Sequence, residues 1–478
     1  MTIDADLDTA LPVSTPSAEG ADAAGILALV DALESDPAQQ PHCLVILRHG
    51  RVIARGSWAP YSAARPQLVY SLSKSFAAAA AGLLVDAGEI DLDAPVISYF
   101  PEWADDITDE RSRRVLVRHV AAMAAGHRDE MIDEAFRADP AEPVRGFLLQ
   151  PPDAEPGTLF AYSQPNTYTL AAIVQRLRGT GLIEVLRGGV LGPIGATDPM
   201  SWQEYPKGRA IGYAGAFVTT DTIARLGQLL LSGGEWNGRR VLSREWVEAA
   251  TSAQVATLKG EPTGVSDSEL GYGFQHWVSR HGFRGDGAFG QFCLVLPESG
   301  VVVALQSETG DMQGTLDHVW RHLLPALAGP GTAAADAALA ARLASAELPP
   351  LRVEGEATPS EGWTDAAFAD AESNLRARVR RDAGQWRLEL SGTRGAVSAP
   401  FAPGDGWRVA GGVPEIAVSG GFEASDRLRL DVAFLEAPHR LHLTLDLAAG
   451  TLTARWRTTP LSNDPAQLLR LAAPRPLR

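Results

Sequence analysis

Ser71 and Lys74, three residues apart, are the pair in this sequence best suited to chemistry. Lysine is scarce here: of the 42 residues that are lysine or arginine, only Lys74, Lys207 and Lys259 are lysine. Arginine stays protonated in proteins, whereas a desolvated lysine can lose its proton and act as a base. Residues i and i+3 of a helix lie on the same side. The spacing therefore predicts a serine nucleophile with a lysine base beside it.

The residues after Lys74 predict the environment that such chemistry needs. The segment 76–85 is apolar on all sides, and a helix of that kind is buried rather than laid on a surface. A lysine in the first turn of a buried helix is partly desolvated, which lowers its pKa. Gly88 is expected to end the helix. The alternative, an accidental match on a solvated surface helix, fits this apolar segment less well.

Two further segments carry candidate side chains. Tyr162 lies in a Gly- and Pro-containing loop ahead of a helix predicted over 167–178. A single loop tyrosine is more often a packing residue, so this segment alone assigns no role. The glycine-rich run 283–291 enters a predicted strand. Its glycines can form a plain turn, or they can let the backbone approach a ligand closely.

Taken in order, these three segments resemble the serine β-lactamase and penicillin-binding-protein superfamily. The likeness is greatest to the branch of class C β-lactamases, esterases and 6-aminohexanoate-dimer hydrolases. It covers about residues 40–328 and includes the connecting segments 88–96, 117–127 and 226–247. The resemblance implies an α+β domain: an antiparallel sheet flanked by helices, plus a helical lobe, with the site between them. It implies no metal ion and no organic cofactor.

The resemblance also implies a role for each candidate. Ser71 would carry the acyl group, and its own N–H would be one oxyanion donor at a helix N-terminus, where negative charge is stabilised. Lys74 and Tyr162 would share the proton transfers, and which of them is the general base stays open at this point. The strand motif maps onto 285–287, so the Ala288 N–H would be the second oxyanion donor. The residues expected to contact substrate are Gln164, Asn166, Gly287 and His127, with a packing role left open for His127.

The sequence departs from the family pattern at two positions. Gln164 stands where the family has asparagine, and its amide reaches one methylene further. Gly285 stands where many relatives have lysine or histidine. In β-lactamases that cation helps to bind the substrate carboxylate, so its absence argues against efficient β-lactam recognition. Arg284 is not expected to replace it, because a strand neighbour points to the opposite face.

Composition excludes several classes of partner. The formal charge of −16 argues against nucleic acid and anionic membranes, which both need a basic face. Two cysteines form no disulfide framework. The first residues have no basic segment followed by an apolar one, so no signal peptide is predicted, and with no predicted membrane span a cytoplasmic location is expected. The acids within 129–134 are interpreted as a solvated loop, an acidic rim for a cationic substrate being the rarer alternative.

Changes in composition predict four regions. Residues 1–20 are expected to be a disordered leader, and 21–328 the hydrolase-like domain. A linker with a short helix spans 329–350. From 351 to 478 apolar and polar residues alternate with period two, which predicts a separate antiparallel β-barrel, somewhat lipocalin-like.

The sequence therefore predicts a serine hydrolase that cleaves a small carboxylic ester through a Ser71 acyl-enzyme. The alternatives of the same fold are an amidase or D-aminopeptidase, acting on a small amide, and a β-lactamase. An alternative of another class is a non-catalytic acyl-binding or scaffold module. The natural substrate, the oligomeric state and the role of the C-terminal domain stay open.

Overall fold

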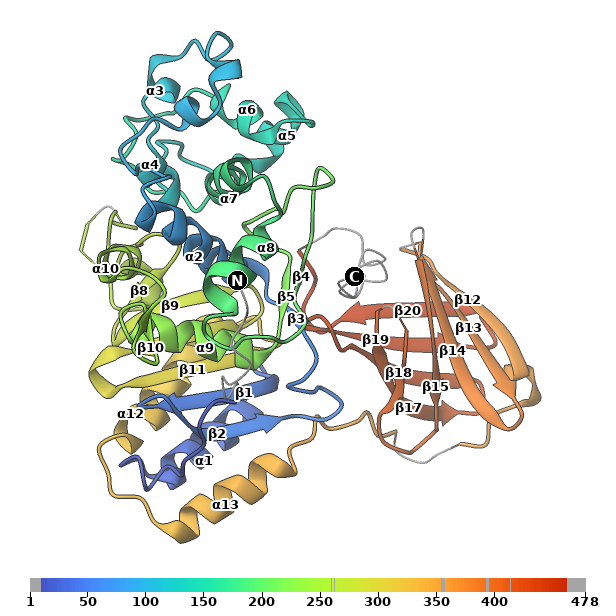
Figure 1. Ribbon diagram of the computed structural model, residues 1–478. Coiled ribbons are helices and arrows are strands. Elements are labelled where there is room, and N and C mark those ends of the chain that lie inside the picture. Colours follow the sequence, from blue (N-terminus) through green and yellow to red (C-terminus); the bar gives the residue numbers. More distant parts are fainter. Residues whose placement is uncertain are drawn as a thin grey trace.

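The computed structural model describes residues 10–258, 260–261, 263–353, 357–372, 374–392, 395–412 and 414–461. An α/β domain with a helical lobe fills one side of the molecule, and a β-barrel stands beside it (Figure 1). Among the described residues, no helix has the length and apolar character needed to cross a membrane.

The first domain is built on an antiparallel sheet of six strands in the order β2-β1-β11-β10-β9-β8. The central strands read as unbroken apolar runs, as expected when both faces of a sheet are covered. Leu44 and Ile46 of β1 pack in the cluster on one face, and Val45 and Leu47 in the cluster on the other. The strands are β1 (Pro41–Arg48), β2 (Arg51–Ser57), β8 (Trp277–Ser279), β9 (Gly282–Gly287), β10 (Gln291–Leu296) and β11 (Val301–Ser307).

Helices cover both faces of this sheet. One layer holds α1 (Ala23–Ser35), α11 (Met312–His318), α12 (Leu324–Ala326) and α13 (Ala333–Ala344). The opposite layer holds α2 (Ser73–Asp86) and α9 (Thr220–Leu231). In Figure 1, α2 lies between the sheet and the helical lobe above it. The predicted stop of α2 is confirmed: Gly88 follows its end with a left-handed φ of 70°.

The helical lobe lies mainly between α2 and α9 in the sequence. Its central helix α7 (Gln164–Arg178) packs against both α2 and α4. The other helices between α2 and α9 are α3 (Glu110–Arg113), α4 (Val117–Ala121), α5 (Ile132–Ala138), α6 (Pro143–Leu148) and α8 (Leu182–Leu186). Helix α10 (Arg244–Thr251) follows α9. Two small sheets stand apart from the six-stranded one. One holds β3 (Gln67–Leu68), β5 (Ala216–Val218) and β4 (Ser201–Trp202), and the other holds β6 (Glu235–Trp236) and β7 (Arg239–Arg240).

The C-terminal strands curl into a nearly closed barrel of nine strands, in the order β15-β14-β13-β12-β20-β19-β18-β17-β16. The predicted alternation is confirmed in β19, where every second side chain is buried. One junction is parallel rather than antiparallel, because β12 pairs with β20 in the same direction. The strands are β12 (Asp365–Asp370), β13 (Arg376–Asp382), β14 (Gln385–Gly392), β15 (Gly395–Phe401), β16 (Arg408–Ala410), β17 (Ile416–Ala424), β18 (Arg427–Phe434), β19 (His439–Asp446) and β20 (Thr451–Trp456).

Large apolar side chains fill the barrel interior. Trp363, Phe368 and Phe422 pack together there, each nearly fully buried. Trp386 also contacts Phe422 across the core. This interior is therefore a packed core, whereas the period-two pattern alone did not distinguish a packed barrel from a ligand-holding one.

The described part of the predicted leader is ordered, which corrects the prediction for residues 10–20. Leu11 is buried, and Val13 forms a parallel bridge with Val52 on the edge strand β2. The backbone of Ser14 donates to Val52 O at 2.9 Å. An edge strand has unpaired backbone N–H and C=O groups with which a neighbouring segment can form hydrogen bonds. These hydrogen bonds hold residues 10–20 in place. Residues 1–9, and residues 462–478 of the predicted barrel domain, lie outside the described residues.

Candidate active site

Ser71 lies in a short 3₁₀ turn, Tyr70–Leu72, that runs directly into α2. The Lys74 ammonium donates to Ser71 Oγ at 3.0 Å and to the carbonyl oxygen of Tyr213 at 2.8 Å. The predicted serine–lysine pair is therefore in contact. The helix begins at Ser73, two residues after the serine, so Ser71 stands at the N-terminal end where the helix dipole stabilises negative charge.

Burial allows the Lys74 ammonium to lose its proton near neutral pH. Only 1% of its surface is exposed. Desolvation lowers the pKa of Lys74 to about 7, and the charges of Glu130 and Asp286 oppose that shift only in part. Among the described residues its hydrogen-bond acceptors are a hydroxyl and a backbone carbonyl, neither of them a carboxylate. The environment therefore suits a proton acceptor rather than a fixed cation.

Tyr162 lies against the same lysine. Lys74 Nζ is 4.6 Å from the centre of the Tyr162 ring, and Trp277 stacks on that ring at 5.3 Å with an angle of 15° between planes. Burial raises the pKa of the Tyr162 phenol well above its usual range; Asp286 adds to the rise, and a hydrogen bond with Ser71 opposes it. The phenol therefore keeps its proton at neutral pH, when the lysine begins to lose its own.

Two glycines let β9 lie directly on the serine turn. A Cβ at Gly287 would stand 2.0 Å from Val69 O, and a Cβ at Gly285 would stand 2.2 Å from Ser75 Oγ. Only glycine permits so close an approach of strand and helix start. The glycine-rich run was expected to enter a strand; most of it forms β9 itself. This packing brings Ala288, the next residue, beside the turn that holds Ser71.

The start of α7 presents amide side chains near Tyr162. Within the described part of the chain, Gln164 Oε1 and Asn166 Oδ1 are buried acceptors with no hydrogen-bond partner. Asn166 is 2% exposed and donates to Ser163 O. The Gln164 backbone N–H donates to the Glu130 carboxylate at 3.0 Å. Glu130, interpreted from sequence as part of a solvated loop, therefore caps the helix that follows Tyr162.

His127 and Arg284 are each held by other parts of the protein. His127 is 4% exposed, its Nε2 donates to Gln150 O at 3.1 Å, and its ring lies 4.9 Å from that of Phe147. This placement favours the packing role. Arg284 is buried, pairs with Asp286 at 2.8 Å and donates to Ser279 Oγ at 2.7 Å, in keeping with the expectation that it does not replace the missing strand cation.

Sequence reasoning did not single out three residues that shape the site. Tyr213 supplies the carbonyl that holds Lys74, and Trp277 packs on Tyr162. Gln275, with a left-handed φ of 64°, donates to Ala121 O and accepts from Thr167 Oγ1, and so joins α4 to α7. These three residues lie outside the motifs, and their distant sequence positions carry no local signal of contact.

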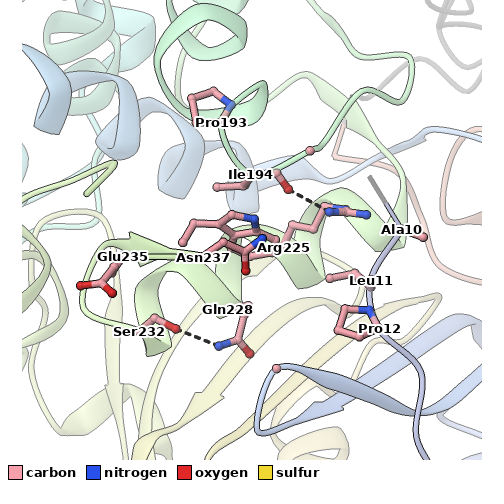
Figure 2. Close-up of a pocket in the computed structure, with 13 residues that line it drawn as sticks. Ala10, Leu11, Pro12, Pro193, Ile194, Arg225, Gln228, Ser232, Glu235 and Asn237 are labelled. Atoms are coloured by element: carbon pink, nitrogen blue, oxygen red, sulfur yellow. Dashed lines mark hydrogen bonds between the residues drawn. The ribbon is translucent and has the colours of Figure 1, made fainter. Parts of the chain in front are cut away.

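A cavity of about 140 Å³, drawn in Figure 2, lies elsewhere. Arg225 extends along it and donates to Ile194 O at 2.8 Å, while Leu11 and Pro12 of the N-terminal segment line its far side. None of the residues that line it belongs to the serine, lysine and tyrosine constellation. Within the described ranges, no group of three or more His, Cys, Asp or Glu side chains could hold a metal ion.

The arrangement brings together a serine hydroxyl at a helix start, a buried lysine of near-neutral pKa and a phenol that keeps its proton. That set can transfer an acyl group to a serine hydroxyl and back to water. Each transfer needs a proton to move between Ser71, Lys74 and Tyr162, which are mutually in contact.

Comparisons with known proteins agree with this geometry. Residues 36–327 match the family model described as beta-lactamase. The 6-aminohexanoate-dimer hydrolase of Paenarthrobacter ureafaciens is 28% identical over 285 residues, 55% of this chain and 71% of that protein. The esterase/beta-lactamase LipL of Mycobacterium tuberculosis is 24% identical over 311 residues, 52% of this chain and 71% of that protein. The octameric penicillin-binding protein homologue from Pyrococcus abyssi shares the fold with a TM-score of 0.50 and 14% identity, over 91% of this chain and 98% of that chain.

Proposed function

This chain belongs to the beta-lactamase family, and from that premise we propose that it hydrolyses a small carboxylic ester through an acyl-enzyme on Ser71. The observation that carries the proposal is the 3.0 Å contact between Lys74 Nζ and Ser71 Oγ at the start of a buried helix. Nucleophilic catalysis by a serine requires such a base within hydrogen-bond reach.

In the proposed acylation, Ser71 Oγ forms a bond to the ester carbonyl carbon while its proton passes to Lys74 Nζ. The carbonyl oxygen becomes an oxyanion, which the N–H groups of Ser71 and Ala288 stabilise. The bond to the leaving oxygen then breaks. That oxygen takes the Tyr162 proton, and Lys74 returns its proton to Tyr162.

Lys74 is the better candidate for the general base. Its pKa of about 7 leaves much of it neutral at physiological pH, whereas the pKa of Tyr162 is raised and the phenol stays protonated. A base works best when its pKa lies near the operating pH. Tyr162 then serves as the acid toward the leaving group. In deacylation water attacks the ester carbon and gives its proton to Lys74. The bond from that carbon to Ser71 Oγ then breaks, Lys74 passes the proton to Ser71 Oγ, and the carboxylic acid is released.

Amide hydrolysis is a second candidate, favoured by one observation. The carbonyl oxygen of the Gln164 side chain, at the start of α7 near Tyr162, has no hydrogen-bond partner among the described residues. It could accept a hydrogen bond from a substrate N–H, which an ester lacks. A β-lactam substrate has less support, because Gly285 leaves the strand without a cation and Arg284 is already paired with Asp286.

Hydrolysis of p-nitrophenyl butyrate by wild type and by Ser71→Ala tests the proposal. We expect turnover in the wild type and a loss of at least about 10³-fold in the variant, as for removal of other serine nucleophiles. Ser98→Ala, at an exposed serine, is the matched control and should retain full activity. Equal turnover in Ser71→Ala would refute a Ser71 acyl-enzyme.

Mass spectrometry separates the hydrolase from the non-catalytic acyl-binding alternative. A hydrolase shows an adduct on Ser71 that decays as product is released. An adduct that forms once and persists, without continued release of product, would support the acyl-binding module. Screening small amides beside esters in the same assay then decides between the two hydrolase candidates.

A further inference from the structure

The C-terminal barrel contacts the catalytic turn directly. The connection between β18 and β19, residues 435–438, lies against the segment just before Ser71. The Leu68 backbone N–H donates to Glu436 O at 2.9 Å. Tyr70, the residue next to Ser71, has its hydroxyl 2.6 Å from His439 Nε2. In Figure 1 the barrel meets the first domain at β3, immediately upstream of this turn.

His439 belongs to an aromatic cluster of three residues with Tyr70 and Phe289. The Phe289 ring lies 5.2 Å from that of Tyr70 and 4.6 Å from that of His439, both edge to face. The His439 and Tyr70 rings are 5.9 Å apart. A barrel residue thus contacts two residues of the first domain that are more than two hundred positions apart in the sequence.

Each first-domain member of the aromatic cluster adjoins a proposed oxyanion donor. Tyr70 precedes Ser71, and Phe289 follows Ala288. Both have left-handed backbones, with φ of 46° at Tyr70 and 65° at Phe289. A bulky residue rarely adopts this conformation, and it persists only where the surroundings enforce it. The backbone of Tyr70 sets the plane of the peptide whose N–H belongs to Ser71.

The hydrogen bonds of His439 define which nitrogen carries the proton. Its Nδ1 is 3.2 Å from the carbonyl oxygen of Thr458, which can only accept, so Nδ1 is the donor. The other nitrogen, Nε2, therefore accepts the bond from the Tyr70 hydroxyl. Burial lowers the pKa of His439 to about 3, so the imidazole stays neutral and this pattern is kept over the working pH range.

We propose that His439 of the barrel is a positioning residue for the oxyanion hole: it holds Tyr70 and Phe289 in their left-handed conformations and so orients the N–H groups of Ser71 and Ala288. The barrel is then a working part of the catalytic site rather than an independent appendage. This inference rests on the proposed Ser71 hydrolase function and adds to it a role for the second domain.

The test measures ester turnover and inhibition by butaneboronic acid in full-length His439→Ala and Tyr70→Phe. The boronic acid forms a B–O bond with Ser71 Oγ, and the resulting tetrahedral anion uses the oxyanion donors. We expect kcat to fall about 10- to 100-fold, somewhat less than on deleting an oxyanion donor outright, with KM within twofold. The inhibition constant of the boronic acid should rise by a similar factor.

Two further variants and a matched control keep the test decisive. His439→Gln can still accept from Tyr70 and donate to Thr458, so it should recover part of the lost kcat. The double variant His439→Ala with Tyr70→Phe should lose no more than His439→Ala alone, because the histidine variant already removes the bond to Tyr70. His442→Ala, a half-buried histidine on the same strand that pairs with Asp431, is the matched control and should keep wild-type values.

The outcomes distinguish the two levels of the proposal. If His439→Ala and Tyr70→Phe both keep kcat and boronic acid affinity within twofold of wild type, the positioning role is wrong. A fall in thermal stability without a change in those two quantities would also overturn it. If wild-type turnover survives in Ser71→Ala, the proposed function itself has failed, whatever the His439 variants show.

Discussion

At the scale of single residues, the site depends on one buried lysine in a protein that otherwise uses arginine. Two opposing pKa shifts come from the same cause, burial: it lowers the pKa of Lys74 and raises that of Tyr162. In water the lysine and the phenol have similar pKa values. Inside this site they separate, so that one is ready to accept a proton and the other to donate one.

Replacing Lys74 by arginine should abolish turnover while keeping a positive charge. Arginine does not deprotonate in proteins, so we expect Lys74→Arg to lose at least about 100-fold in kcat/KM, the contribution of a general base. The matched control is Lys207→Arg, at an exposed lysine, which should be unaffected. Retention of more than a tenth of the activity in Lys74→Arg would move the general-base role to Tyr162.

The pH dependence of kcat/KM should follow Lys74. The neutral amine is the active form, so the rate should rise with pH and level off above about 7, where the lysine has lost its proton. Values of kcat/KM measured between about pH 5 and about pH 9 would show this rise and the plateau above it. A rate that is already maximal at the acid end and falls as pH rises through neutrality would contradict the assignment.

Tyr162→Phe should separate amide from ester substrates. An amine leaving group must be protonated as it departs, whereas p-nitrophenolate leaves readily without a proton. We expect a loss of about 10²–10⁴-fold for an anilide and a smaller loss for p-nitrophenyl butyrate. Equal losses for the two substrates would mean that Tyr162 does not protonate the leaving group.

At the scale of elements, the site exists because β9 lies against the turn before α2. Strands and helix starts are normally kept apart by side chains, and Gly285 and Gly287 remove them here. The same contact holds the end of β9, which Ala288 follows, against the turn that contains Ser71. The left-handed residues Tyr70 and Phe289 bend the chain on either side of this contact.

Gly287→Ala should therefore damage both stability and catalysis. Its Cβ would stand 2.0 Å from Val69 O, a backbone atom that cannot move alone, so we expect a loss of about 1–3 kcal/mol or more in the free energy of unfolding. We also expect kcat of the folded variant to fall, because the added Cβ displaces Ala288. Gly188→Ala, at an exposed glycine with nothing within 4 Å, is the control. If Gly287→Ala has the melting temperature and kcat of the wild type, the close approach of β9 to the serine turn is not needed for stability or catalysis.

At the scale of the whole molecule, a buried acid joins the two domains. Glu308 follows β11 in the first domain and has no exposed side-chain surface. It accepts hydrogen bonds from the backbone and hydroxyl of Thr458, at 3.1 and 2.7 Å, and from the Arg440 backbone. Burial raises the pKa of Glu308 to about 7, although Arg440 and Arg457 oppose the rise. We therefore expect the stability of the contact between the domains to depend on pH.

Glu308→Gln should change how stability depends on pH. With its pKa raised in the folded state, Glu308 stabilises the fold most below its unfolded pKa, and that contribution is lost as pH rises through about 7. Relative to the glutamine variant, wild type should lose on the order of 2–3 kcal/mol between pH 5 and pH 8. Melting temperatures of both proteins across this range measure the difference. Glu298→Gln, at an exposed glutamate, is the control, and its melting temperature should depend on pH as that of the wild type does.

Residue types and their spacing within short segments determined the candidate catalytic pair and many of the helices and strands. The Ser71–Lys74 pair, the apolar run of α2 and the strands β10 and β11 are visible in the sequence, because each depends on residues a few positions apart. The alternation of β18 and β19 likewise indicates a barrel. The segment 10–20 was misjudged because its order comes from pairing with β2, which composition does not register.

Only the tertiary structure decided which distant groups meet. The carbonyl of Tyr213 and the cap at Glu130 reach the site from two separate loops, and the ring of Trp277 reaches it from the start of β8. The contact of His439 with Tyr70 joins residues 369 positions apart. The pKa of Lys74 likewise depends on how completely the surrounding elements exclude water from it. The residue pattern within a segment indicates which helix or strand that segment can form. Contacts between distant residues, and the exclusion of water from the site, arise only when the helices and strands pack together.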